Sequence, residues 1–229
     1  MTVCIGALAE NRKKLVLAAD KMITANIPIA YQFEKEDVQK IYTLSEKVRV
    51  LTAGNALFAF EIVENTKKDI SKSALDGKPF TSVEEYAECI RVNYQNFRRK
   101  IIVQSVLEPR GLNLQSYYQL QKSLNPGIVQ EIEQAFINYN LGVDLIVAGV
   151  NDDSCHLYSI THPGVSTSHD AIGYVSVGSG APHAMYSLIA SAYTKGKTLD
   201  EVKTFVEEAK KRSEVAPGVG KETEIVILQ

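Results

Sequence analysis

The sequence predicts an α+β fold in which helices gather on the faces of β-sheets. A length of 229 residues fits one sizeable domain or two small ones, and no convincing interdomain linker is visible. An apolar fraction of 45% is enough for a substantial core. Short apolar runs alternate with amphipathic stretches in the order strands, two helices, strands, two helices, strand. This order is typical of the α+β class, so we expect a single domain over residues 1–229.

The first quarter of the chain is predicted to form strands. Its apolar runs lie at residues 3–9, 14–19, 40–44 and 48–53. Four polar residues, Glu10-Asn11-Arg12-Lys13, join the first two runs and have the length of a hairpin connection. After Gly54 the apolar period changes, which predicts a helix that ends near residue 71.

The middle of the chain is predicted to be helical. Ser82-Val83-Glu84-Glu85 has the spacing of a capping box, so a helix begins there and continues towards residue 106. The stretch Glu108-Pro109-Arg110-Gly111 ends it. Two short helices follow, over about 114–124 and 127–138. Because they are rich in Tyr, Gln and Glu, we expect residues 101–140 to form a helical insertion on the surface and not a second core.

The last part of the chain repeats the order of strands followed by helices. Strands are predicted at residues 143–150, 157–161, 174–177 and 223–228. The turn Gly178-Ser179-Gly180 leads into a helix that ends near residue 193. Thr198-Leu199-Asp200-Glu201 is a second capping box and begins the last helix.

Composition argues against several classes of function. A net charge of −2 gives no electrostatic reason to bind nucleic acid or an anionic membrane. The three cysteines are far apart and form no C-x-x-C, as expected of free thiols in a reducing cytoplasm. We expect neither a signal peptide nor a membrane span. The four histidines lack ligand spacing, and no phosphate-binding loop is present, so no metal, no cofactor and no intrinsic ATP use are predicted.

Thr2 is the residue with the most distinctive chemistry. Removal of Met1 leaves a threonine that carries a hydroxyl and a free α-amine, so the nucleophile brings its own base. An α-amine has an ordinary pKa of roughly 7.7–8.0, which suits a general base near neutral pH. With Met1 attached, the same nitrogen is a planar amide without useful basicity. We therefore expect activity to depend on removal of Met1.

Several short pieces of the sequence, in their order and approximate spacing, resemble a proteasome β-type subunit of the N-terminal-nucleophile hydrolases. These pieces are Thr2, the segment Leu17-Ala18-Ala19-Asp20-Lys21-Met22-Ile23-Thr24, the segment Lys40-Ile41-Tyr42-Thr43-Leu44, Thr52-Ala53-Gly54, and Gly178-Ser179-Gly180-Ala181-Pro182. The resemblance implies a four-layer αββα sandwich, a homo-oligomer that can form a ring, and a peptide or protein substrate. A partner that unfolds substrates with ATP would be a separate chain, which the sequence does not identify.

The resemblance also assigns catalytic roles. Thr2 is the nucleophile, Lys40 supplies positive charge beside it, and Asp20 orients Lys40. The backbone N–H of Gly54 is the oxyanion-hole donor, and Ser179 forms a hydrogen bond near the amine. Each residue taken alone has a simpler explanation. Thr2 follows the start, Asp20 is a turn residue and Lys40 is an exposed lysine. Gly54 ends a strand, and Ser179 caps a helix. Only the set together favours an active site.

The resemblance assigns a substrate-binding region as well. Thr24 is expected to hydrogen-bond the substrate backbone, as an added strand would. Ile23, Thr52 and Ala56 are expected to line the pocket for the side chain before the cleaved bond. Because these side chains are uncharged and of modest size, we expect a preference for apolar residues.

The chain departs from the family after its last long helix. Ser213 stands where active subunits carry an aspartate, and Ala216 stands near the position of their serine. Glu214, shifted by one residue, is a possible substitute for the carboxylate. Residues 101–140 have no counterpart in the resemblance. A non-catalytic ring scaffold, a small-molecule amidase and a peptide ligase on the same fold therefore stay open as alternatives to a threonine peptidase.

Overall fold

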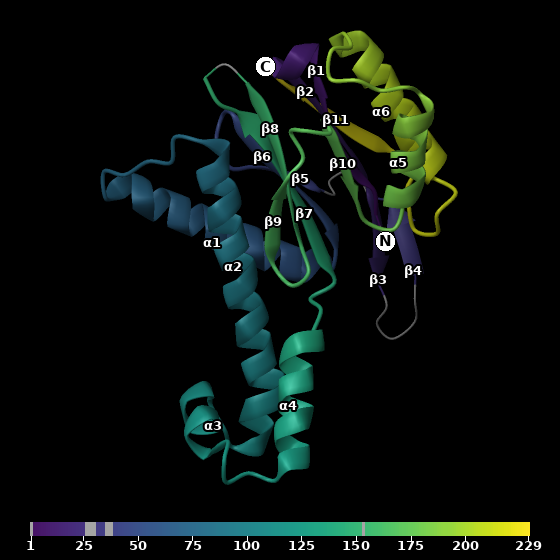
Figure 1. The fold of residues 1–229 in the computed structure, drawn as a ribbon. Coiled ribbons are helices and arrows are strands. Elements are labelled where there is room, and N and C mark those ends of the chain that lie inside the picture. Colours follow the sequence, from purple (N-terminus) through teal and green to yellow (C-terminus); the bar gives the residue numbers. More distant parts are fainter. Residues whose placement is uncertain (1, 26–30, 35–38, 153) are drawn as a thin grey trace.

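A computed structural model gives a mixed fold with two large antiparallel sheets and, in the part of the chain it describes, six α-helices (Figure 1). The structure describes all residues except 1, 26–30, 35–38 and 153. The four-stranded sheet has the order β10 (Tyr174–Val177), β1 (Cys4–Ala9), β2 (Lys14–Asp20), β11 (Thr223–Leu228). The five-stranded sheet has the order β5 (Ile41–Thr43), β6 (Val48–Gly54), β7 (Val143–Val150), β8 (Cys155–Thr161), β9 (Val165–Ser168).

Three strands were not predicted from the sequence. β3 (Met22–Ala25) and β4 (Tyr31–Glu34) form a small sheet of their own. β9 pairs with β8, but it consists of Val, Ser and Thr side chains that are exposed or half-buried. An exposed edge strand has little apolar pattern, so no period-two signal predicts it. The predicted hairpin is confirmed, because β1 and β2 pair and a short 3₁₀ turn, η1 (Glu10–Arg12), joins them.

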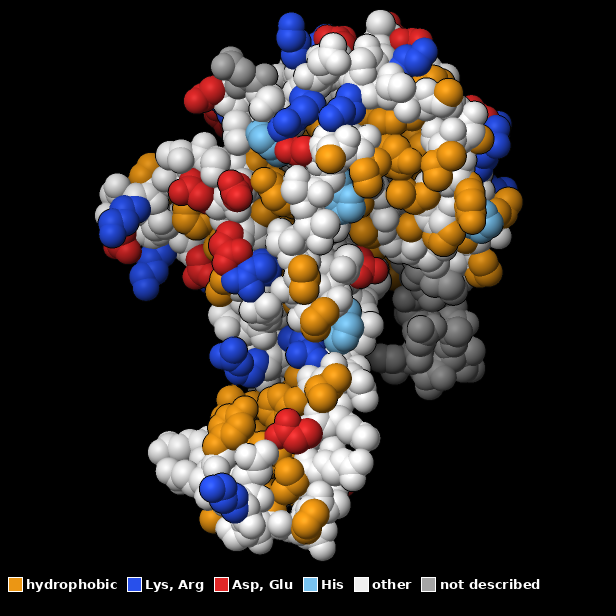
Figure 2. Space-filling model, viewed as in Figure 1, with side chains coloured by type: hydrophobic (Ala, Val, Ile, Leu, Met, Phe, Trp, Pro, Cys, Tyr) orange, Lys and Arg blue, Asp and Glu red, His pale blue; other side chains and the backbone are white. Residues whose placement is uncertain are grey.

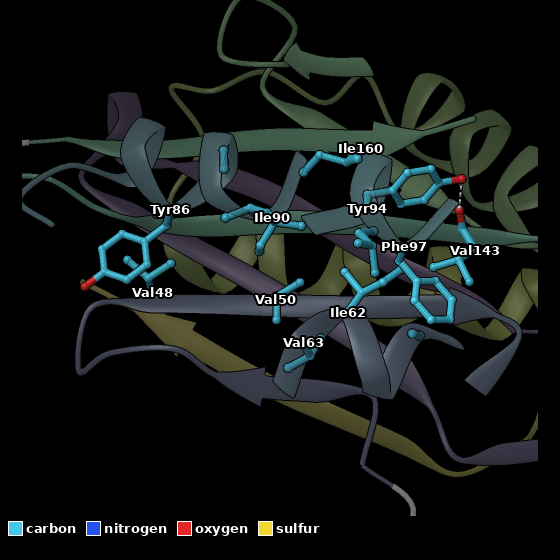
Figure 3. Close-up of a cluster of buried hydrophobic side chains, with 14 of the residues drawn as sticks. Val48, Val50, Ile62, Val63, Tyr86, Ile90, Tyr94, Phe97, Val143 and Ile160 are labelled. Atoms are coloured by element: carbon cyan, nitrogen blue, oxygen red, sulfur yellow. Dashed lines mark hydrogen bonds between the residues drawn. The ribbon is translucent and has the colours of Figure 1, made fainter. Parts of the chain in front are cut away.

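Helices α1 (Ala56–Leu75) and α2 (Val83–Ile102) pack on the five-stranded sheet. Figure 3 shows Ile62 and Val63 of α1 and Ile90 and Phe97 of α2 directed towards the strands. The predicted capping box at Ser82 is confirmed, since its side chain and that of Glu85 exchange hydrogen bonds with the backbone.

A second apolar cluster lies between the two large sheets. It joins side chains of β1 and β2 to side chains of β6, β7 and β8, with Cys4, Leu17, Leu51, Ile146 and Leu157 among its members. Gly6 of β1 permits this close approach, because a Cβ there would lie 2.8 Å from Cδ2 of Leu157.

A third cluster joins the other face of the four-stranded sheet to α5 (Ala181–Ala190) and α6 (Leu199–Ser213). Ile5 and Val16 of the sheet pack against Leu188 and Val206 of these helices. The predicted capping box at Thr198 begins α6 and is confirmed.

The insertion projects from the body as a separate lobe (Figures 1 and 2). It contains the π-helical segment η2 (Val103–Leu107), the 3₁₀ turn η3 (Glu108–Arg110), α3 (Leu114–Leu120) and α4 (Pro126–Asn138). The expectation that it forms no core was wrong, because Leu107, Tyr117 and Ile132 are fully buried together. The hydroxyl of Tyr117 donates to Glu133 over 2.6 Å, so a polar sequence can bury this ring.

Candidate active site

Three side chains predicted to act together converge at one end of the space between the large sheets. Thr2 lies just before β1, Asp20 ends β2, and Lys40 lies just before β5. Nζ of Lys40 donates to Oγ1 of Thr2 over 2.6 Å and to Oδ1 of Asp20 over 2.9 Å. The three residues are only 3%, 1% and 8% exposed for Thr2, Asp20 and Lys40. The lysine therefore joins a buried hydroxyl to a buried carboxylate.

The carboxylate of Asp20 is fixed by backbone donors as well as by the lysine. Oδ1 accepts from the N–H of Val3 over 2.9 Å, and Oδ2 accepts from the N–H groups of Met22 and Gly220 over 3.1 and 2.9 Å. Three N–H donors and one ammonium satisfy both oxygens, which makes a buried carboxylate tolerable. The donor of Gly220 was not predicted, because a backbone group 200 residues away in sequence leaves no side-chain signal.

The turn between β10 and α5 holds Thr2 from the other side. The nitrogen of Thr2 donates to Oγ of Ser179 over 3.2 Å, and the N–H of Gly180 donates to the carbonyl of Thr2 over 3.2 Å. Gly178 has a φ of +93°, and a Cβ there would lie 2.3 Å from the same carbonyl oxygen. Only glycine fits this position, so Ser179 comes within reach of the Thr2 nitrogen.

Gly54 ends β6 next to this cluster. Its φ of +93° and the 1.9 Å that would separate a Cβ from the carbonyl oxygen of Gly142 both require glycine. The preceding residue, Ala53, lies against the turn of Ser179, since a Cβ on Gly178 would be 3.2 Å from that of Ala53. Gly54 is exposed at this end of the sheet. Its role as an oxyanion donor stays a prediction.

The predicted substrate-binding residues lie on three elements around the cluster. Ile23 is half-buried in β3, Thr52 is buried in β6, and Ala56 is exposed at the first turn of α1. The backbone of Thr24 belongs to β3, but its side chain lies outside the described part of the structure. Met1, on whose removal the prediction of activity depends, also lies outside it.

Ser213, which ends α6, and Glu214, which follows it, have partners other than Thr2. The hydroxyl of Ser213 is buried and donates to the carbonyl of Ala209 over 2.8 Å. A Cβ on Gly180 would lie 3.1 Å from Cβ of Ser213, so Ser213 packs behind the turn of Ser179. Glu214 instead forms an ion pair with Lys210 at 2.8 Å.

The nearest thiol does not compete with Thr2 as a nucleophile. Cys4 is fully buried, and its Sγ donates to the carbonyl of Thr52 over 3.3 Å. Burial raises the pKa of Cys4 far above its usual range, so the thiolate is not formed. Cys4, Cys89 and Cys155 are all free. The described residues contain no group of His, Cys, Asp or Glu side chains arranged to hold a metal ion.

A family model described as proteasome subunit matches residues 112–227, which is about half of the chain. The chain belongs to the proteasome subunit family. No curated protein matches it. The matched residues of this proteasome family member include Ser179 and Ser213, whereas Thr2, Asp20 and Lys40 precede them. No helix in the described part is both long and apolar enough to cross a membrane.

Proposed function

We propose that this chain is a threonine-type N-terminal-nucleophile amidohydrolase that cleaves peptides or proteins and needs no cofactor. The observation that carries the proposal is the hydrogen bond from Lys40 to Oγ1 of Thr2, made while Lys40 is held by Asp20. A buried ammonium needs acceptors for its three N–H groups, and one acceptor of Lys40 is the hydroxyl that would attack the substrate. A positive charge in this position stabilises a developing alkoxide.

In the proposed mechanism, removal of Met1 frees the α-amine of Thr2. Oγ1 attacks the substrate carbonyl carbon and its proton passes to that amine, while the ammonium of Lys40 stabilises the oxygen that loses it. The N–H of Gly54 stabilises the oxyanion. Collapse breaks the C–N bond, and the protonated amine of Thr2 returns the proton to the leaving nitrogen. Water then hydrolyses the ester on Thr2; an amine in its place would give ligation.

The broader setting follows from the family. We propose a homo-oligomer, because proteasome subunits assemble into rings, and a cytoplasmic location, which suits three free cysteines. The three apolar clusters, which join helices to a sheet, sheet to sheet, and sheet to helices, support the αββα sandwich. Ile23, Thr24, Thr52 and Ala56 would bind the acyl part of the substrate.

The test is a covalent label on processed protein. Intact mass of the protein purified from cells is expected to lack the initiator methionine. A threonine-directed inhibitor should then add to Thr2, and Thr2→Ala should remove both the adduct and peptide hydrolysis. Thr2→Ser, which keeps the hydroxyl and the amine, should retain part of the activity. Processed protein that neither cleaves peptides nor forms the adduct would refute the proposal.

A second candidate is a non-catalytic ring scaffold of the same family. The arrangement at the end of α6 favours it, since Ser213 donates to a helix carbonyl and Glu214 pairs with Lys210. Without a carboxylate supplied to Ser179 from the end of α6, the amine of Thr2 has one polar partner fewer than in the family pattern. The same labelling experiment decides between the two, because a scaffold forms no adduct on Thr2.

A further inference from the structure

A carboxylate that no described residue holds by a hydrogen bond or an ion pair lies at the start of β7. Asp144 is half-buried and makes no hydrogen bond or ion pair in the described part of the chain. Its neighbours Val143 and Leu145 pack towards α1 and α2, whereas Ile146 belongs to the cluster between the two sheets. Because side chains alternate along a strand, Asp144 lies on the same face as Ile146 and points into the space between the sheets.

The register of the strands places Asp144 beside the candidate active site. Asp144 is directly opposite Ala53 in the antiparallel pair of β6 and β7. Directly paired residues have Cβ atoms about 5 Å apart. A Cβ on Gly178 would in turn lie 3.2 Å from Cβ of Ala53 and 2.3 Å from the carbonyl oxygen of Thr2. Asp144 therefore adjoins the turn that holds the nitrogen of Thr2.

Strand order shows on which side of Thr2 this carboxylate lies. In the four-stranded sheet, β1 with Thr2 lies between β10, which leads to Ser179, and β2, which ends at Asp20. The facing sheet has the order β5, β6, β7. Lys40, just before β5, contacts Asp20, and Ala53 of β6 adjoins Gly178. Asp144 of β7 comes next in this order. Asp144 thus lies on the Ser179 side of Thr2, away from Asp20 and β3.

The electrostatic setting compensates this charge only in part. Burial raises the pKa of Asp144, and His162 opposes this effect by lowering it. The negative charge of Asp144 in turn raises the pKa of Cys4 and of Tyr94. A half-buried carboxylate without a donor is unfavourable unless a cation completes it. A ligand that binds in the site can supply this cation.

We propose that Asp144 makes the Thr2 site select peptides in which a lysine or arginine immediately follows the cleaved bond. The inference rests on the proposed function, which assigns the acyl part of the substrate to the side of β3. The leaving-group part then lies on the Ser179 side, where the carboxylate of Asp144 has no hydrogen-bond donor among the described residues. The acyl-side pocket keeps its expected apolar preference, because Ile23, Thr52 and Ala56 are uncharged.

The test compares two quenched peptides that differ only in the residue after the cleaved bond, lysine in one and norleucine in the other. Processed wild-type protein should cleave the lysine peptide with a kcat/KM about tenfold higher, as expected for one charge-assisted hydrogen bond. Asp144→Asn should cleave both at the norleucine rate. Glu224→Gln is the matched control, since Glu224 is also half-buried with a raised pKa but lies on β11, beyond Asp20. It should keep the preference.

A binding arm separates this inference from the proposed function. In the Thr2→Ala background, the lysine peptide should bind about tenfold more tightly than the norleucine peptide, and Asp144→Asn should abolish the difference. Hydrolysis without any preference for lysine would overturn the inference and leave the peptidase intact. Selective binding without hydrolysis in processed Thr2 protein would refute the peptidase and support the selection by Asp144. Equal binding of both peptides to Thr2→Ala would overturn the selection.

Discussion

Two carboxylates at opposite ends of the β1–β2 hairpin each hold a basic side chain, but their surroundings differ. At the open end, Asp20 pairs with Lys40, whose ammonium also donates to the hydroxyl of Thr2. At the turn end, Asp170 pairs with Arg12 at 2.8 Å. Nε of Arg12 donates to the carbonyl of Cys155 over 3.2 Å, so this cation is used to join η1 to β8.

The difference shows what distinguishes a structural ion pair from one suited to catalysis. A guanidinium spreads its charge over a planar fork, and here the fork links a carboxylate and a carbonyl of different elements. An ammonium is a compact charge, and in the cluster of Asp20 it lies 2.6 Å from an oxygen that can become a nucleophile. A carboxylate partner is common to both. Of the two cations, Lys40 is the one that also contacts a hydroxyl, that of Thr2.

The largest difference is expected in turnover. Lys40→Met should reduce peptide hydrolysis by about 10³-fold or more, because the positive charge at the attacking oxygen is lost. Arg12→Met should leave kcat unchanged, since Arg12 lies at the far end of the hairpin. The measurement is kcat of each purified variant on one fluorogenic peptide, with circular dichroism as the check on folding. Similar losses in both variants would show that Lys40 acts only through stability.

The second difference is expected in stability. Asp20→Ala should lower the free energy of unfolding by about 3–5 kcal/mol, because it leaves a buried ammonium without its counter-charge and three N–H groups without an acceptor. The side chain of Asp170 is 17% exposed, so water can replace part of its contacts. Asp170→Ala should cost about 1–3 kcal/mol. A lower urea midpoint for Asp170→Ala than for Asp20→Ala would contradict this order.

The two clusters were not equally predictable from the sequence. Thr2, Asp20 and Lys40 each end or precede an apolar run, and the family pattern connected them. The sequence predicts only a polar hairpin connection for Arg12 and no ligand role for His156, because only the packing of η1 against β8 brings the two together. The capping boxes at Ser82 and Thr198 were predictable, since a cap depends on residues three apart. The core of the insertion was not, since its apolar residues are sparse in each helix and gather only in three dimensions.

A smaller difference is expected in the response to acid. His169, next to Asp170, contacts Ser159 Oγ at 2.8 Å, and burial lowers the pKa of His169 below its usual 6.5. The unfolded chain therefore binds this proton at a higher pH than the folded one. Stability is retained above about pH 6.5 and falls between that value and the lower folded pKa.

Removal of this histidine should flatten the acid response of the turn end. His169→Gln keeps a hydrogen-bonding side chain, so the urea midpoint should change less than that of wild type between about pH 7.5 and about pH 5.5. Because the group is only half-buried, the expected effect is below about 1 kcal/mol. Parallel curves for the two proteins would place the acid sensitivity elsewhere in the molecule.

The smallest effect is expected at Ser154, although its geometry resembles a Ser-His-Asp triad. Oγ of Ser154 lies 3.1 Å from Nε2 of His156, and Nδ1 of that ring lies 2.7 Å from Oδ2 of Asp170. The guanidinium of Arg12, however, donates to the same Oδ2 and lies 2.9 Å from Nδ1. A base in a triad must become an imidazolium as it takes the serine proton, and an adjacent cation opposes that charge.

Ser154→Ala should therefore leave peptide hydrolysis unchanged and alter the free energy of unfolding by no more than about 0.5 kcal/mol. A fluorophosphonate probe should not label Ser154 in the Thr2→Ala protein, where the proposed nucleophile is absent. Arg12→Met is the informative companion, because it removes the cation beside the ring. Labelling of Ser154 in the presence of Arg12 would mean that the turn end carries a nucleophile of its own. The ion pair of Asp170 and Arg12 would then not be purely structural.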